Sequence, residues 1–283
     1  MKKFLALTMA LAMVMSLAAC GNSSSSSAGS SASNSSSASQ SDASSSGDTS
    51  SSGELTTIQE GKLIMSTNAA FPPYEMTDDN GNVVGIDADI AAAIAEKLGL
   101  ELVIDDMDFD SALLAVQQGK SDMVMAGVSV DPEREAVMDF STSYATGIQS
   151  IVVKEDSPIT SADNLYVDGA DYQIGVQQDT TGDIYCSDDF GDDHVQRFNK
   201  GADAVAALVS GKLDCVVIDN EPAKSFVAAN EGLKVLDTAY AVEDYAAAFA
   251  KGSELTEPFN KALEELITDG TVQKIVDKYI SAD

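Results

Sequence analysis

The stretch Met123–Asp139, MVMAGVSVDPEREAVMD, decides the fold, because it passes from a strand into a helix through a short polar loop. Its first four residues are apolar and predict a buried strand, after which Gly127 lets the backbone turn without a Cβ. Asp131 and Pro132 predict a helix start, with an acid at the N-cap and a proline at the first helical position.

The loop between this strand and this helix suits a carboxylate ligand. It offers free backbone N–H groups at the positive end of a helix dipole. It also carries one hydroxyl, Ser129, and one guanidinium, Arg134, which can bind both oxygens of a carboxylate. The alternative is that Arg134 is only a solvated charge at a helix end, and this loop alone does not decide between the two.

The composition allows two modest cores and argues against several kinds of partner. The chain has 283 residues, of which 44% are hydrophobic, enough for two lobes or for one core with tails. Its formal net charge is -30, so binding to nucleic acid or to anionic lipid through basic protein surface is not expected. No metal site or cofactor is expected either, because His194 is the only histidine.

The N-terminal segment, residues 1–20, is predicted to be a lipoprotein signal peptide. Two lysines precede a short apolar run, Phe4–Leu17, which is too short to span a membrane comfortably. The following LAACG (residues 17–21) resembles a bacterial lipobox, in which Cys20 would be diacylated and become the mature N-terminus. The alternative is an ordinary signal peptide with a chance cysteine.

We therefore expect an extracytoplasmic protein that is held at the cell membrane only by the lipid on Cys20. This would be the cell surface of a Gram-positive-type bacterium, or otherwise the periplasmic face. Residues 21–53 are nearly all Ser, Ala, Gly and Asn and cannot bury enough surface to fold. They are predicted to form a disordered tether with a root-mean-square span of roughly 30 Å.

From residue 54 onward, strands and helices alternate, which predicts an α/β fold with mostly parallel sheets. Such sheets bind ligands beyond the carboxyl ends of their strands. Asn80-Gly81 predicts a hairpin turn, and Asp87 is expected to cap a helix that ends at Leu98. The other early elements expected are strands at Lys62–Thr67 and Glu101–Ile104 and a helix that ends at Gly119.

An internal echo predicts two similar lobes. LLAVQQGKSDMVMAG (residues 113–127) and VAALVSGKLDCVVID (residues 205–219) share an apolar helix, Gly-Lys-x-Asp and an apolar strand. Two extended runs, Ile148–Lys154 and Asp244–Phe249, are interpreted as crossovers that form a hinge. The predicted boundaries are 54–148 with 242–283 for lobe 1 and 149–241 for lobe 2.

The echo places Asp219 in lobe 2 where Gly127 lies in lobe 1. If the lobes face each other, Arg134 and Asp219 look into one cleft from opposite sides. A small zwitterion would fit, with its carboxylate on Arg134 and its ammonium on Asp219. The alternative is that Asp219 only caps a helix that starts near Pro222.

Several short motifs together resemble one known family. They are AFPPYE (70–75), GIDADI (85–90), MDF (107–109), AGVS (126–129), PER (132–134), MDFS (138–141), GVQ (175–177), TTG (180–182), Asp214, Asp219 and DGT (269–271). From about residue 54 to the end, the chain resembles the solute-binding proteins of the polar amino acid family that serve ABC importers. The resemblance implies a two-lobed periplasmic-binding-protein fold (type II). It also implies a monomer with an amino acid ligand and with ABC permease and ATPase subunits as partners.

The resemblance also implies a role for each site residue. Arg134 would chelate the α-carboxylate with nearby backbone amides, and Asp219 would hold the α-ammonium with the Gly127 carbonyl and the Ser129 hydroxyl. An amide at Asn68, where relatives for cationic amino acids often carry an acid, favours a neutral polar ligand. The implied ligand-binding set is Asn68, Phe71, Phe109, Ala126, Gly127, Ser129, Arg134, Gln177, Thr180, Thr181 and Asp219.

Three questions stay open at this point. The same fold could carry a dehydratase of prephenate-like acids, for which Glu75 is the only obvious general acid, or a sensory receptor that does not transport. A binding protein without enzymatic activity is the favoured interpretation. Cys186 and Cys215 both fall in lobe 2 and could form a disulfide or stay as buried thiols.

Overall fold

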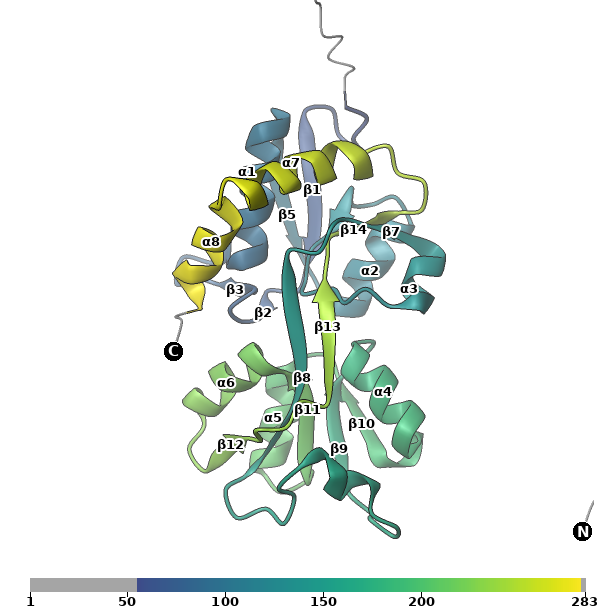
Figure 1. Ribbon diagram of the computed structural model, residues 1–283, viewed down its shortest axis with the longest axis vertical. Helices are drawn as coiled ribbons and strands as arrows, with labels where there is room; N and C mark the ends of the chain where they lie inside the picture. The colour runs from purple at the N-terminus through teal and green to yellow at the C-terminus, as the bar shows by residue number, and fades with distance from the viewer. Residues whose placement is uncertain (1–54, 281–283) are drawn as a thin grey trace, which may run out of the picture. The chain divides into compact units, whose positions relative to one another are not determined.

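The computed structural model describes residues 55–280 and has two lobes joined by a pair of hinge strands (Figure 1). The predicted signal peptide, its lipidation site at Cys20 and the Ser-rich tether lie outside the described residues. Among the described residues, no helix combines the length and the apolar composition needed to cross a bilayer.

The first lobe is built on a five-stranded sheet with helices packed against it. In spatial order its strands are β5 (Glu101–Asp106), β1 (Lys62–Thr67), β6 (Met123–Val124), β14 (Ala248–Ala250) and β7 (Met138–Phe140). A small antiparallel sheet of β2 (Ala70–Phe71), β3 (Glu75–Thr77) and β4 (Val83–Val84) lies beside it, and its β3–β4 pair is the hairpin predicted at Asn80-Gly81. The helices of this lobe are α1 (Ile86–Leu98), α2 (Phe109–Gln117), α3 (Pro132–Val137), α7 (Thr256–Thr268) and α8 (Thr271–Tyr279).

The second lobe is built on a six-stranded sheet. Its strands are, in spatial order, β10 (Val195–Phe198), β9 (Ile174–Gln177), β11 (Cys215–Asp219), β8 (Ala145–Lys154) and β12 (Leu233–Val235), and β13 (Ala241–Tyr245) pairs with the other end of β8. Its helices are α4 (Thr181–Phe190), α5 (Gly201–Val209) and α6 (Asn220–Ala229), with short 3₁₀ turns at Ala162–Tyr166 and Asp192–His194.

Both sheets are mixed rather than mostly parallel, which corrects a detail of the expected fold. In the first lobe β1 pairs in parallel with β5 and β6, but β14 runs antiparallel to β6 and β7. In the second lobe β9 pairs in parallel with β10 and β11, whereas β8 runs antiparallel to β11, β12 and β13. The reason is that the chain leaves one lobe and later returns, so the connecting strands enter each sheet in the opposite direction.

The echo in the sequence corresponds to a repeated structural unit. In each lobe a helix ends near a glycine with positive φ, Gly119 (65°) or Gly211 (75°), and an aspartate follows before the next strand. The Asp122 carboxylate accepts from Ile64 N at 2.7 Å, in the neighbouring parallel strand β1. The Asp214 carboxylate accepts from Gln173 N at 2.8 Å, just before β9. The aspartate therefore recurs because it satisfies a backbone donor where a neighbouring strand starts.

The two C-terminal helices return to the first lobe, as predicted. Helices α7 and α8 lie across α1, as the upper part of Figure 1 shows. Phe259, Leu263 and Leu266 of α7 are buried in the same core as Ile90 and Ile94 of α1. The C-terminal helices therefore complete the core to which the first helix of the fold contributes.

The two cysteines of the second lobe are free thiols in the structure, so the disulfide that the sequence left open is not formed there. Both side chains are fully buried in the apolar cluster of that lobe. Burial raises the pKa of Cys186 to about 12 and raises the pKa of Cys215 as well. Both groups therefore behave as small apolar side chains.

We predict that Gly147→Ala destabilises the protein by about 1–3 kcal/mol, because the hinge has no room for an extra methyl group. An added Cβ at Gly147 of β8 would overlap the buried ring of Tyr245, which lies on the paired strand β13. Urea unfolding would measure the loss. Gly175→Ala is the matched control, since its added Cβ meets mainly the mobile end of Leu213, and it should cost less. Equal losses would contradict the prediction.

Candidate functional site

A cavity lies between the two lobes, where loops from both sheets meet. All eleven residues that the sequence analysis placed in the ligand site line it, and Glu75 joins them. Lobe 1 supplies Asn68, Phe71, Glu75, Phe109, Ala126, Gly127, Ser129 and Arg134, and lobe 2 supplies Gln177, Thr180, Thr181 and Asp219.

Arg134 reaches the cavity because of the helix start predicted around Asp131. The Asp131 carboxylate accepts from the backbone N–H groups of Glu133 and Arg134, and Pro132 takes the first helical position. The same carboxylate forms an ion pair with Arg134 Nε at 3.1 Å. Asp131 therefore fixes both the helix end and the orientation of the guanidinium.

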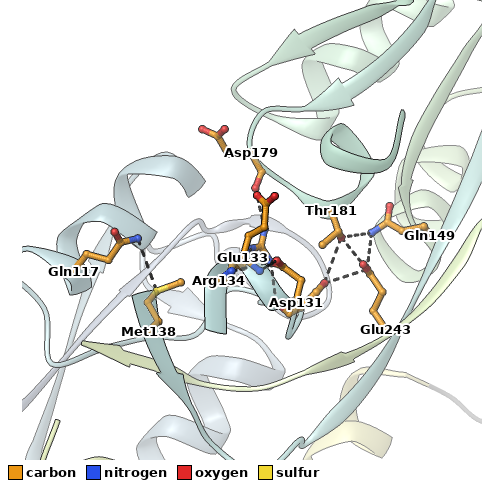
Figure 2. Close-up of polar contacts among 10 residues, drawn as sticks. Gln117, Asp131, Glu133, Arg134, Met138, Gln149, Asp179, Thr181 and Glu243 are labelled. Carbon is orange, nitrogen blue, oxygen red and sulfur yellow. Dashed lines mark hydrogen bonds and ion pairs between the residues drawn. The ribbon is translucent and has the colours of Figure 1, made fainter. Parts of the chain in front are cut away.

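The Arg134 guanidinium is buried, with 7% of the residue exposed, and bridges the lobes. Its Nη1 donates to the Ser129 carbonyl at 2.9 Å, and its Nη2 donates to the Asp179 carbonyl of the second lobe at 2.9 Å (Figure 2). Its Cζ lies 5.5 Å from the centre of the Phe109 ring. Burial lowers the pKa of Arg134, while the charge of Asp131 opposes that shift. The group keeps a fork of donors that suits a carboxylate.

Asp219 approaches the cavity from the other lobe, at the end of β11. Its Oδ2 accepts from Gln149 Nε2 at 2.8 Å, and its Oδ1 accepts from the Tyr245 hydroxyl. Burial, followed by the nearby charge of Glu243, raises the pKa of Asp219 well above its usual range. A cationic group at this carboxylate would relieve both effects.

Three further lining residues, Asn68, Glu75 and Gln177, present mainly acceptors. Asn68 Nδ2 donates to the Met107 carbonyl at 2.7 Å, and Asn68 Oδ1 accepts from Gln177 Nε2 of the other lobe at 3.1 Å. Both Glu75 carboxyl oxygens and Gln177 Oε1 are buried and have no hydrogen-bond donor within the described residues. Phe71 and Phe109 supply the apolar walls. This part of the cavity can therefore take an aliphatic chain that terminates in hydrogen-bond donors.

Asp87 does not cap helix α1, which corrects the sequence-based expectation. The N-cap position is Gly85, and Asp87 lies inside the helix with its side chain fully buried. Its Oδ2 accepts from the Gly127 backbone N–H at 2.9 Å and from the Tyr144 hydroxyl at 2.8 Å. Asp87 can be buried inside the helix because the loop at Gly127 brings to it a backbone N–H group that would otherwise have no acceptor.

Asp87 and Glu75 are two fully buried carboxyl groups, one inside α1 and one on the cavity lining. Each would lie near the other's negative charge if both were ionised, so one of them holds a proton. Burial, and then the charge of Asp87, raises the pKa of Glu75 well above its usual range. Burial also raises the pKa of Asp87 to about 6, against the lowering effect of the donors from Gly127 and Tyr144.

Three polar residues near the cavity were missed by the sequence analysis: Gln149, Glu243 and Tyr245. They lie on the hinge strands β8 and β13. Gln149 and Tyr245 fall in the runs interpreted only as crossovers, and Glu243 directly precedes the second of these runs. Gln149 interrupts an apolar run, and Glu243 and Tyr245 lie two residues apart, on the same buried face of β13. The signal available in the sequence was a polar residue within a hinge strand. To find Tyr245, the pairing of its strand with β8 also had to be known.

A two-lobed α/β protein whose closed cleft presents a guanidinium from one lobe and a carboxylate from the other has the architecture of a solute-binding protein. The chain belongs to the bacterial extracellular solute-binding proteins, family 3, whose model matches residues 63–282. This confirms the family resemblance and the two-lobed fold class.

Individual relatives bind amino acids. The arginine-binding extracellular protein ArtP of Bacillus subtilis (strain 168) is 36% identical over 225 residues, which cover 78% of this chain and 87% of ArtP. A solved structure of an ancestral arginine-binding protein bound to arginine has 39% identity and a TM-score of 0.72, covering 78% of this chain and 99% of that one. An ancestral arginine-binding protein bound to glutamine has 38% identity and a TM-score of 0.73, covering 79% and 100%.

We predict that Asp87→Asn gains stability relative to the wild type as pH rises. The Asp87 carboxyl has a pKa of about 6 in the folded protein against an ordinary value of 3.8, so the folded protein keeps a proton that the unfolded chain releases. Wild-type stability from this group is therefore complete below about pH 4 and falls as pH rises through about 6, whereas asparagine does not titrate.

The difference in the free energy of unfolding between variant and wild type should shift by at most about 3 kcal/mol between pH 4 and pH 7.5. Urea titrations at both pH values measure it. Asp79→Asn, at an exposed position of the β3–β4 turn, removes the same formal charge and should show no comparable shift. A pH-independent difference for Asp87→Asn would show that this carboxyl does not titrate as proposed.

Proposed function

We propose that this protein is a lipid-anchored extracytoplasmic receptor that binds an L-amino acid between its lobes and delivers it to an ABC importer. The observation that carries the proposal is the convergence of Arg134 and Asp219 on one cavity from opposite lobes. The α-carboxylate would lie on Arg134 and the N-terminal amides of α4, and the α-ammonium on Asp219. The anchoring lipid on Cys20 and the pairing with permease and ATPase subunits belong to the same proposal, as does a monomeric state.

Closure of the lobes follows from how the contacts are divided. Each lobe holds only part of the polar groups that a zwitterion needs, so the ligand stabilises the closed form selectively. Hydrogen bonds already cross the cleft, from Arg134 to the Asp179 carbonyl and from Gln177 to Asn68. Asn199 Nδ2 also donates to Asp108 Oδ2 at 3.1 Å. These contacts explain how the closed form is held around a ligand.

We propose further that the ligand's side chain ends in hydrogen-bond donors. The acceptors of Glu75 and Gln177 that lack a donor support this, and a cationic end such as a guanidinium would offset the effects that raise the pKa of the buried Glu75 carboxyl. The neutral ligand expected from Asn68 stays as the alternative, with a carboxamide as its end group. The relatives support both, since arginine-binding proteins of this family have been solved with arginine and with glutamine.

A thermal-shift panel of the twenty amino acids and cystine should identify the ligand. We expect L-arginine to raise the melting temperature most, followed by L-lysine, L-histidine or L-glutamine. Calorimetry would then give the affinity. A larger shift with L-glutamine than with any cationic amino acid would support the neutral alternative, and no shift with any amino acid would contradict the proposed function.

We predict that Arg134→Ala weakens binding of the amino acid found in the panel by roughly 3–5 kcal/mol, because a buried carboxylate would lose its charged partner. Arg134→Lys should recover only part of this, since an ammonium cannot bind both oxygens. Lys97→Ala removes a charge from an exposed position on α1 and serves as the control. Wild-type affinity in Arg134→Ala would remove this residue from the site.

We also propose that the protein does not turn over its ligand. The relatives are binding proteins of transporters. The dehydratase alternative needs Glu75 as a general acid. A buried Glu75 near Asp87 equally fits a residue that recognises the side chain of a bound amino acid. Incubation of purified protein with cyclohexadienyl acids, followed by mass spectrometry, should show no product.

A further inference from the structure

We infer that Glu243 is a positioning residue that makes the Ser129 and Thr181 hydroxyls acceptors for the ammonium group of the ligand. This role rests on the proposed function of the cavity. Glu243 lies on hinge strand β13 and is not itself among the residues that line the cavity. It acts through the two hydroxyls, which do line it and which come from different lobes.

One oxygen of Glu243 is the centre of a buried hydrogen-bond cluster (Figure 2). Its Oε2 accepts from Ser129 Oγ at 3.0 Å, from Thr181 Oγ1 at 2.9 Å and from Gln149 Nε2 at 3.1 Å. The residue is 7% exposed, and Ser129 and Thr181 are buried to a similar degree. The Oγ atoms of the two hydroxyls lie 3.4 Å apart, close to the limit of a hydrogen bond between them.

The chemistry of a hydroxyl makes this arrangement directional. A serine or threonine hydroxyl has one proton to donate and two lone pairs that accept. When the proton goes to Glu243, only lone pairs are left for a group in the cavity. Both hydroxyls can then accept from an ammonium, and neither can donate to a carboxylate.

The surroundings keep Glu243 in the accepting role. Gln149 Nε2 donates to Asp219 Oδ2 at 2.8 Å and to Glu243 Oε2 at 3.1 Å, and makes a longer contact with Thr181 Oγ1 at 3.3 Å. Gln149 therefore holds the two carboxylates at a fixed spacing without giving either a negative neighbour in direct contact. Gln149 thereby links Asp219, which binds the ammonium, to Glu243, which orients the hydroxyls.

The consequence is that the ligand can bind in only one orientation. Its ammonium is directed to the acceptors at Asp219, Ser129 and Thr181, and its carboxylate is left with the donors of Arg134. An analogue without the amino group would leave buried lone pairs without a donor. Glu243 therefore contributes to the selection of amino acids over acids that lack an α-amino group.

The test compares L-arginine with its des-amino analogue, 5-guanidinopentanoate, by calorimetry on wild type and Glu243→Gln. An amide nitrogen at the Oε2 position would donate to the hydroxyls, and an amide oxygen there is a weaker acceptor than a carboxylate, so either rotamer loosens the hold on the hydroxyl protons. We expect the affinity for L-arginine to fall about 10- to 100-fold, and that for the des-amino analogue to change less than about threefold. Should the panel identify L-glutamine as the ligand, L-glutamine and glutaramic acid make the same pair.

Two controls separate this role from others. Asp244→Asn removes an acid from the exposed face of the same strand and should leave the affinity for both compounds unchanged. Thr181→Val removes one hydroxyl, and in a variant lacking both hydroxyls (Ser129→Ala, Thr181→Val) the effect of Glu243→Gln should largely disappear. That non-additivity distinguishes orientation of hydroxyls from a direct charge effect, which would persist in the hydroxyl-free background.

Three results would overturn the inference. Equal loss of affinity for both compounds in Glu243→Gln would indicate a merely structural role. An unchanged affinity for L-arginine would indicate no role, and a fully additive effect in the hydroxyl-free background would assign the effect to charge alone. If no amino acid binds the wild type, the proposed function fails first, and that outcome is distinct from all three. If Glu243→Gln does not fold, Thr181→Val alone must still lose selectivity for the amino group.

Discussion

The structure depends on the burial of opposite charges in a cleft that neither lobe can complete alone. Arg134 is buried in the first lobe beside Asp131 and donates to a carbonyl of the second lobe. The acids Asp219, Glu75 and Glu243 are buried around the same space. A buried charge is costly without a partner, so the cleft favours a guest that brings a carboxylate and a cation in the right order.

The hinge strands do more than connect the lobes. Strand β13 pairs along its length with the first half of β8, and the two strands place Gln149, Glu243 and Tyr245 beside the cavity. Gly147 makes room for the Tyr245 ring that holds Asp219. A change in the hinge therefore reaches Asp219 through direct contacts, so movement of the lobes is coupled to the geometry of the cavity.

The same helix–glycine–aspartate–strand unit occurs in both lobes, but the residues that follow its strand have different roles. In both lobes a helix, a glycine with positive φ and an aspartate lead into a central strand. Beyond the strand the lobes diverge. Lobe 1 continues into Gly127, whose N–H binds Asp87, and lobe 2 continues into Asp219, which faces the cavity. The shared part builds the core, and the difference lies at the carboxyl ends of the strands, where α/β sheets place their ligands.

The sequence by itself determined most of the elements, the helix start at Asp131–Pro132 and the repeat that sets Arg134 and Asp219 against each other, which follow from local rules of capping, turns and apolar periodicity. The full set of eleven residues that meet at the cavity came from the resemblance to a known family, which is carried by motifs with fixed spacing. Only the tertiary structure decided the role of Asp87, the mixed sheets and the cluster around Glu243. Their partners lie far away in the chain, as Ser129 and Thr181 do for Glu243, so no local pattern encodes which donors a buried acid will meet once the strands pair.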